Sequence, residues 1–298
     1  MRENRPIAVL FGGSGMVGRA VTQELAQAGW QIRIPTRNLE KTKELKPYGT
    51  TGQIVPLYAD APSDAGLATL MKGADAVVNL IGSLQQTKAV PLKVLYVELA
   101  ARIARLAKAA NVHSCVHISA HGADEKAATA YHRTKAAGEK AVSTFFPEST
   151  ILQPNLIYGP YDRTLNPLAD IARISPLLPM AGWGEAKMQP IYVGDVARAV
   201  RCCLEQVATK GCIFELNGSD LLTQKELLQL IAATQHKKRT LIPVPWALLA
   251  LVARLPFSPL SPDLIRLWQT DYTATSLPQI TDLGIKPRPM DKALAGYL

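Results

Sequence analysis

Short apolar runs alternate with helically spaced apolar positions through the first half of the chain. The runs predict strands at residues 7–11, 31–36, 54–58, 76–81 and 115–119. Helical spacing between them predicts helices, including 16–28 and a long one that Pro91 opens. Strands that read as continuous apolar runs and alternate with helices are typical of a parallel sheet covered on both faces. The pattern therefore predicts an α/β fold with a doubly wound parallel sheet.

A glycine-rich turn follows the first predicted strand. Residues 7–18 read I-A-V-L-F-G-G-S-G-M-V-G, which fits G-x-x-G-x-x-G from Gly12 and G-x-G-x-x-G from Gly13. In either register, missing side chains let the chain turn tightly and let a pyrophosphate approach the amides of the following helix. The sequence therefore predicts a dinucleotide-binding Rossmann core, in which the cofactor contacts the turn residues Gly12, Gly13, Ser14, Gly15, Met16, Val17 and Gly18.

Two further strand ends supply candidate cofactor contacts, because the carboxyl ends of parallel strands meet at one edge of a doubly wound sheet. Asp60 and Ala61 follow the third strand, where we expect the adenine. Leu80, Ile81 and Gly82 close the fourth strand, where we expect the adjoining ribose.

Arg37 ends the second predicted strand, at the position that distinguishes the two nicotinamide cofactors. An acid there accepts from the ribose 2′-hydroxyl of NAD, whereas a guanidinium complements the 2′-phosphate of NADP. No acidic residue adjoins Arg37 in the sequence. We therefore expect NADP(H) in preference to NAD(H); the alternative is a solvated arginine at a strand end.

Tyr131 and Lys135 lie four residues apart on a helix predicted to run to about Phe145, so they share one face. At this spacing the ammonium could lower the pKa of the phenol, which is near 10 when unperturbed, and let it exchange a proton with a substrate oxygen. The same lysine could hold the nicotinamide ribose. A Y-x-x-x-K pair is weak evidence alone, but this one follows the fifth strand, where the substrate edge is expected.

The second half of the chain predicts shorter elements. These are helices at 166–175, 195–206 and 223–235 and strands at 189–192 and 212–216, with a Thr223/Glu226 capping box on the last helix. We expect residues 1–160 to form the dinucleotide-binding core and 161–298 a small C-terminal subdomain partly interleaved with it.

Leu241 to Phe257 is an apolar segment with prolines at 243, 245 and 256. The helix predicted from Trp246 to Leu255 is apolar on almost every face but too short to cross a bilayer. It could lie at a membrane surface, dock on a partner, or be buried against its own subdomain.

Composition narrows the function classes. The net charge is +9, yet the basic residues are scattered and no aromatic residues alternate with them, so we expect no nucleic-acid partner. Phosphorylated cofactors and acidic membrane surfaces remain candidates. The four cysteines have no C-x-x-C spacing, and His113, His117 and His121 lie beside a strand without a carboxylate, so no metal site is predicted. With no signal peptide expected before the first strand, we expect a bacterial cytoplasm.

Several motifs carry a family resemblance. The glycine turn, residues 79–82, the Tyr131/Lys135 pair and residues 153–160 together resemble the extended and atypical short-chain dehydrogenase/reductase superfamily. Residues 138–140, 146–148, 158–159, 162–163, 165–166, 189–193, 195–196 and 282–285 are similar to the family of the NADPH-binding accessory subunit of mitochondrial complex I, alpha subcomplex subunit nine, and its bacterial relatives.

The resemblance implies an NADPH-binding fold with no established turnover, in a family linked to complex I and, through related members, to ubiquinone biosynthesis. It also implies cofactor contacts from Ser119, Tyr131, Lys135, Pro154 and Asn155, and a substrate wall in which the loop 181–188 forms one lip.

One position departs from the superfamily's active enzymes, which usually place a Ser or Thr at the end of the fifth strand. The residue there is Ala120, and Ser119 comes one residue early. A one-residue shift on a strand turns a side chain to the opposite face. Tyr131 and Lys135 could therefore serve ribose binding rather than chemistry, unless a loop brings Ser119 into place.

Two hypotheses follow. The first is an NADP(H)-binding protein with a structural, sensing or quinone-linked respiratory role, whose partners are complex I or quinone-pathway proteins. The second is an NADP(H)-dependent oxidoreductase in which Tyr131 is the acid/base, Lys135 tunes it, and a carbonyl or quinone-related substrate binds. A sugar-nucleotide epimerase is disfavoured, because the spacing from the fifth strand to Tyr131 is shorter than those enzymes usually show.

Overall fold

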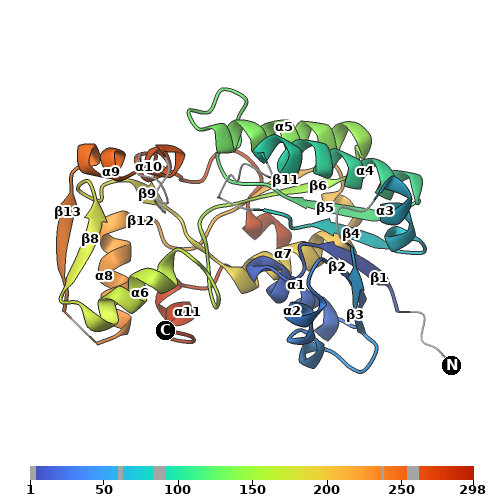
Figure 1. Ribbon diagram of the computed structural model, residues 1–298, viewed down its shortest axis with the longest axis horizontal. Helices are drawn as coiled ribbons and strands as arrows, with labels where there is room; N and C mark the ends of the chain where they lie inside the picture. Colours follow the sequence, from blue (N-terminus) through green and yellow to red (C-terminus); the bar gives the residue numbers. More distant parts are fainter. Residues whose placement is uncertain (1–4, 60–62, 83–90, 237, 254–261) are drawn as a thin grey trace.

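A parallel sheet forms the centre of the larger lobe (Figure 1). The structure is a computed structural model that describes residues 5–59, 63–82, 91–236, 238–253 and 262–298. Among these residues the sheet has seven strands in the order β3-β2-β1-β4-β5-β6-β11, and every pairing is parallel. The strands are β1 (Ile7–Phe11), β2 (Gln31–Thr36), β3 (Ile54–Tyr58), β4 (Ala76–Asn79), β5 (Ser114–Ile118), β6 (Thr150–Pro154) and β11 (Ile213–Leu216). The strand order reverses between β1 and β4, which is where such sheets bind ligands.

Helices cover both faces of this sheet (Figure 1). One layer holds α1 (Met16–Gln27), α2 (Leu39–Lys43) and α7 (Val193–Glu205), and the other holds α3 (Asp64–Met71), α4 (Leu99–Ala109) and α5 (Ala130–Phe145). Side chains alternate along β1: Ala8 and Leu10 pack in the core cluster of α1 and α7, while Val9 and Phe11 pack in that of α3, α4 and α5. Burial on both faces explains the uninterrupted apolar runs in the sequence.

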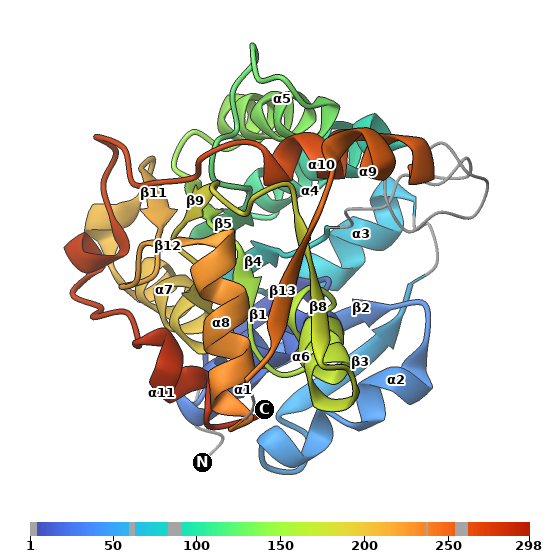
Figure 2. The ribbon, with the colours of Figure 1, turned by 90° about the vertical axis from the view of Figure 1, so that its left-hand side faces the viewer.

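The smaller lobe lies beyond the carboxyl ends of β5, β6 and β11 (Figure 2). It contains α6 (Leu165–Ile174), β8 (Leu177–Ala181), β9 (Lys187–Met188), β12 (Leu222–Thr223), α8 (Gln224–Thr234), β13 (Thr240–Val244), α9 (Trp246–Val252), α10 (Pro262–Trp268) and α11 (Met290–Leu294). Its own core includes Leu165, Leu178, Leu227, Ile231 and Met290. Because α7 and β11 return to the large sheet between α6 and α8, the subdomain is interleaved with the core.

The short strands β7 (Ile157–Tyr158) and β10 (Ile191–Tyr192) pair where the two lobes join. Three short helical turns complete the connections, at Lys46–Tyr48 (η1), Val207–Thr209 (η3) and Ile280–Leu283 (η4).

The predicted α/β class with a doubly wound parallel sheet and a small interleaved subdomain is confirmed. Several details differ from the sequence prediction, among them β6 of the main sheet, which was not predicted. The fourth strand ends at Asn79, so Leu80 to Gly82 lie beyond it, and the helix opened by Pro91 contains a π-helical turn, Val94–Glu98 (η2). The parallel pairing of β8 with β13 was not predicted, because it joins segments about sixty residues apart.

The apolar segment 241–257 forms β13 and α9 in its described part, and residues 254–257 lie outside the described residues. No residue of α9 is fully buried, but Trp246 lies against Gly182 of the same subdomain, so the helix is partly packed on its own subdomain and partly exposed. Leu248 is 49% exposed and Leu251 60% exposed. In the part of the chain that the structure describes, no helix is long and apolar enough to cross a membrane.

Candidate cofactor and catalytic site

The glycine turn folds back on the end of β4 and on α1. Gly12 has a φ of +87°, and a Cβ on it would lie 2.9 Å from the carbonyl oxygen of Leu80. A Cβ on Gly18 would lie 2.3 Å from the carbonyl oxygen of Gly12. Both positions therefore require glycine, and the structure favours the G-x-x-G-x-x-G register from Gly12.

The first turn of α1 suits a phosphate group. Gly15 is exposed and caps the helix without a side-chain hydrogen bond, and the first turn holds no acidic residue. The amides of Met16 and Val17 thus face no competing capping side chain, and the helix dipole favours an anion there. The site fits the pyrophosphate of a dinucleotide.

The other strand-end residues are placed as follows. Arg37 directly follows β2 and is exposed at the same sheet edge as the glycine turn. Leu80 contacts the turn through Gly12, and Ile81 donates its backbone N–H to the side chain of Asn79. Asp60 and Ala61 lie outside the described residues.

The helix that carries Tyr131 and Lys135 begins after Thr129, whose hydroxyl caps it by accepting from the N–H of His132. Lys135 is only 3% exposed, and its Nζ donates to the carbonyl oxygen of Ile118 at 3.1 Å. Nζ lies 5.9 Å from the centre of the Tyr131 ring. The structure therefore brings both side chains to the carboxyl end of β5, as the helical spacing predicted.

Burial dominates the electrostatics of this pair. It lowers the pKa of Lys135 to about 7, although Glu139 acts in the opposite direction. Burial also raises the pKa of Tyr131, with smaller contributions from Tyr96 and Tyr272. The expected lowering of the phenol pKa by the ammonium is therefore not met in this structure.

Buried polar side chains surround Lys135 on the α5 side of the sheet. We call the following residues the Lys135 cluster: Asn79, His117, Ser119, Lys135, Glu139 and Gln153. Gln153 donates to both carboxylate oxygens of Glu139, at 2.9 and 3.1 Å. The side chains of Asn79 and His117 approach to 3.1 Å, and burial followed by the Lys135 charge lowers the pKa of His117 to about 3.

Ser119, which is also a member of the Lys135 cluster, is 3% exposed. Burial raises the pKa of Glu139, and the Ser119 hydroxyl beside it is the largest influence in the opposite direction. Ser119 thus lies on the same α5 side of the sheet as Lys135, so the expectation that the one-residue shift turns it to the opposite face is not met. The next residue, Ala120, offers no hydroxyl.

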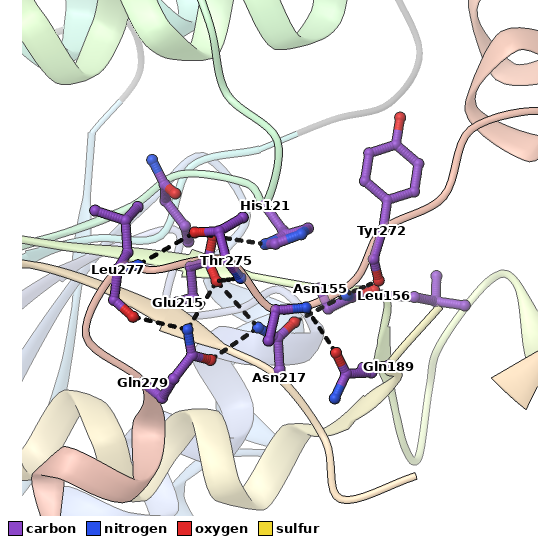
Figure 3. Close-up of polar contacts among 12 residues, drawn as sticks. His121, Asn155, Leu156, Gln189, Glu215, Asn217, Tyr272, Thr275, Leu277 and Gln279 are labelled. Atoms are coloured by element: carbon purple, nitrogen blue, oxygen red, sulfur yellow. Dashed lines mark hydrogen bonds and ion pairs between the residues drawn. The ribbon is translucent and has the colours of Figure 1, made fainter. Parts of the chain in front are cut away.

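A C-terminal segment, residues 271–279, crosses the ends of β6 and β11 (Figure 3). Asn155 donates to Asn217 at 2.9 Å and to the carbonyl oxygen of Tyr272 at 2.8 Å, so its amide is engaged within the fold. Glu215, 2% exposed, accepts from the N–H and hydroxyl of Thr275 and from Gln279. The preceding residue, Pro154, is buried at the end of β6.

The same segment also contacts two histidines near Tyr131. The Tyr272 ring packs against His121 and His132, with centroids 6.0 and 5.3 Å apart. His121 lies 3.4 Å from Glu215, yet burial keeps its pKa below the usual value. Among the described residues, no three His, Cys, Asp or Glu side chains form a cluster that could hold a metal ion.

Sequence reasoning missed two parts of this site. Glu139 follows Lys135 at the same four-residue spacing that links Tyr131 to Lys135, so helical periodicity could have found it. Tyr96 gave no such signal, because its placement depends on the π-helical turn.

Comparisons of the sequence with known proteins agree with this geometry. Residues 8–216 match the NAD dependent epimerase/dehydratase family. The chain is 30% identical to the mitochondrial NADH dehydrogenase [ubiquinone] 1 alpha subcomplex subunit 9 of Arabidopsis thaliana, over 98% of this chain and 76% of that protein. The same subunit of Rattus norvegicus is 30% identical over 96% of this chain and 78% of its own length. A ceramide reductase of Caulobacter vibrioides is 27% identical over 81% and 74%.

Solved structures show the same fold. An epimerase from Methanothermobacter thermautotrophicus superposes with a TM-score of 0.74 at 18% identity, covering 97% of this chain and 90% of that chain. UDP-glucuronic acid 4-epimerase from Bacillus cereus, solved with UDP-glucuronic acid and NAD, also gives 0.74, at 16% identity with 97% and 96% covered.

Proposed function

Because the chain belongs to the NAD dependent epimerase/dehydratase family and is related to alpha subcomplex subunit 9 along nearly its whole length, we propose that it is an NADP(H)-binding protein with weak or no turnover. Its role would be a structural one, a sensing one, or a respiratory one that is linked to quinones. A nicotinamide dinucleotide is the cofactor expected of this family.

The described residues would contact the pyrophosphate, the two riboses and the 2′-phosphate of this cofactor. The glycine turn would hold the pyrophosphate, Leu80 to Gly82 the adenine-side ribose, and Arg37 the 2′-phosphate. Lys135 would donate to the hydroxyls of the nicotinamide ribose, beside Tyr131. Bound nicotinamide would supply a hydride donor or acceptor. The preference for NADP(H) rests on the exposed guanidinium of Arg37.

The proposal of weak turnover is supported by the surroundings of two hydroxyl groups near Lys135, those of Ser119 and Tyr131. The Ser119 hydroxyl lies beside Glu139 in the Lys135 cluster, and burial raises the pKa of the Tyr131 phenol. Loss of one donor to a developing oxyanion typically costs about 2.7 to 4 kcal/mol of transition-state stabilisation. A phenol with a raised pKa also deprotonates less readily at neutral pH.

A retained cofactor would stabilise the fold. Binding to the native state alone adds RT ln(1 + [L]/Kd), roughly 4 kcal/mol at a thousandfold excess over Kd. Tightly held NADP(H) would then act as part of the structure that partners recognise.

The partners we propose are respiratory complex I or quinone-pathway proteins, by analogy with the relatives' names. The exposed apolar side chains of α9 would supply a docking contact, either with such a protein or with the inner face of a bacterial cytoplasmic membrane. The net charge of +9 favours an acidic surface.

A second candidate is an NADP(H)-dependent oxidoreductase. It is favoured by the placement of Tyr131 and Lys135 on one face of α5, and by a relative named ceramide reductase. A carbonyl or quinone-related substrate would bind beneath the lip at residues 181–188.

The two functions make different demands on Tyr131. NADPH oxidation would be followed with a panel of carbonyl and quinone substrates, for wild type and Tyr131→Phe. The binding protein shows the same background rate in both. A substrate-dependent rate that Tyr131→Phe lowers by about a hundredfold or more would establish the enzyme instead.

A further inference from the structure

Tyr96 lies in the middle of the π-helical turn Val94–Glu98, just before α4. Its side chain is among the largest in the protein that are fully buried, with 2% exposed. A π-helical turn inserts an extra residue into a helix and re-aims the side chains around it, and such turns are frequent at functional sites.

The ring lies directly beneath the ammonium of Lys135. Nζ is 4.2 Å from the ring centre, closer than to the Tyr131 ring at 5.9 Å. The Tyr131 ring meets that of Tyr96 edge-on, with centroids 5.8 Å apart and planes at 84°. Tyr96 thus contacts both members of the Tyr131/Lys135 pair.

The hydroxyl end of Tyr96 points to the cofactor edge of the sheet. A Cβ on Gly82 would lie 3.7 Å from the Tyr96 hydroxyl oxygen. Tyr96 therefore spans the distance from Lys135 to the end of β4, where the ribose next to the adenine is expected.

A close backbone contact holds Tyr96 in this place. A Cβ on Gly138 would lie 2.3 Å from the carbonyl oxygen of Tyr96, so α5 packs against the π-helical turn only because residue 138 is glycine. Gly138 is one turn away from Lys135 on the same helix. The turn and the lysine are thus positioned together.

We propose that Tyr96 is a positioning residue for Lys135, whose ammonium it holds on the face of its ring at the edge where the nicotinamide ribose binds. The inference rests on the proposed NADP(H) binding. An aromatic face attracts a desolvated cation more strongly than an exposed one, and it leaves the ammonium's N–H groups free to donate elsewhere. A hydrogen bond to Ile118 uses one of them.

Other charged or titratable groups also act on Lys135. Glu139 and Tyr131 lie on α5 itself, and His117 comes from β5. Burial lowers the pKa of Lys135 to about 7 while Glu139 opposes it, and His117 is neutral at that pH. Loss of the Tyr96 ring would move the lysine further towards its neutral form.

NADPH titrations of the whole protein, followed by nucleotide fluorescence from acidic to alkaline pH, test this role. In wild type the affinity begins to fall as the pH rises through the Lys135 pKa, near 7. Tyr96→Leu moves that onset down by about one pH unit and weakens alkaline binding about tenfold. Tyr96→Phe, which keeps the aromatic face, restores the wild-type onset.

A Lys135→Met background separates this role from general packing. In that background Tyr96→Leu has no further pH-dependent effect. Uniformly weaker binding of Tyr96→Leu at every pH, or an unchanged onset, would overturn the inference. Tyr96→Met fills the space without an aromatic face and replaces Tyr96→Leu should the latter not fold. If wild type does not bind NADPH, the proposed function itself is contradicted. If wild type binds NADPH but the Tyr96 variants do not change the pH onset, only the role of Tyr96 is contradicted.

Discussion

The ammonium of Lys135 donates a 3.1 Å hydrogen bond to the carbonyl oxygen of Ile118, the last residue of β5. This bond fixes a side chain of α5 to a strand end, and so sets the position of the helix at the ligand-binding edge of the sheet. It also keeps a basic group 97% buried, which holds the lysine pKa near 7. The same group therefore links the fold to pH and, in the proposed function, to the cofactor.

The buried lysine gives the protein a pH-dependent stability. The folded pKa is about 7, below the value of about 10.4 expected in the unfolded chain. Between these values the unfolded state binds more protons, so wild-type stability rises with pH, by on the order of 5 kcal/mol from this group. Urea unfolding of wild type and Lys135→Met across this range measures it. Parallel stability curves for the two proteins would show that Lys135 is not buried as described.

Arg37→Glu should weaken NADPH binding by about 10- to 100-fold and spare NADH, because a charge-assisted hydrogen bond contributes about 1.5 to 3 kcal/mol. Calorimetric titration with each nucleotide measures the two affinities. Lys46→Glu, an equal charge change at another exposed position, is the control and should leave the ratio unchanged. If Arg37→Glu binds both nucleotides as wild type does, the cofactor preference is set elsewhere.

Two glycine variants should separate binding from folding. Gly15 is exposed with a φ of −76°, and a Cβ there would meet only the Gly12 carbonyl oxygen, at 3.3 Å. Gly15→Ala should therefore keep the thermal midpoint but weaken NADPH binding at least about tenfold, since the methyl group occupies the pyrophosphate approach.

Gly29→Ala is the matched control. Gly29 has a φ of +86° with nothing near its missing Cβ, at the end of α1. Alanine there should cost about 1 to 2 kcal/mol of stability and leave nucleotide affinity intact. Equal losses of affinity in the two variants would contradict the assignment of the turn.

Glu215 should stabilise the strap of residues 271–279 only when ionised. Burial acts to raise its pKa, but hydrogen bonds from Gln279 and Thr275 outweigh it, so the folded pKa lies below the usual value. The stabilisation is thus present above the unfolded pKa of about 4.3 and lost as the pH falls below it. Glu215→Gln should cost about 1.5 to 3 kcal/mol at neutral pH. Denaturation at acidic pH should narrow the gap between the two proteins; a constant gap would count against this account.

Several elements of the fold could be predicted from the sequence, because the sequence pattern within each element agrees with the structure that the element adopts. The apolar run Ile7–Phe11 reads as a strand buried on both faces, and Thr223 with Glu226 forms the predicted capping box. Each signal lies within a few residues of the element that it predicts.

The parts that could not be predicted depend on contacts between distant segments. Apolar residues such as Leu95 and Leu99 fit an ordinary helix, so nothing local indicates the π-helical turn that places Tyr96. The contact of His121 with Glu215 joins residues far apart in the chain. The exposure of α9 also escaped the pattern, because an all-apolar helix is equally expected in a core.

The most direct test of the central claim is to purify the protein without added nucleotide, release its ligand by denaturation, identify it by mass and time the exchange of labelled NADPH into the native protein. We predict near-stoichiometric NADPH that exchanges over hours. An empty site, or one that exchanges rapidly, would contradict a retained structural cofactor and favour a turning-over oxidoreductase.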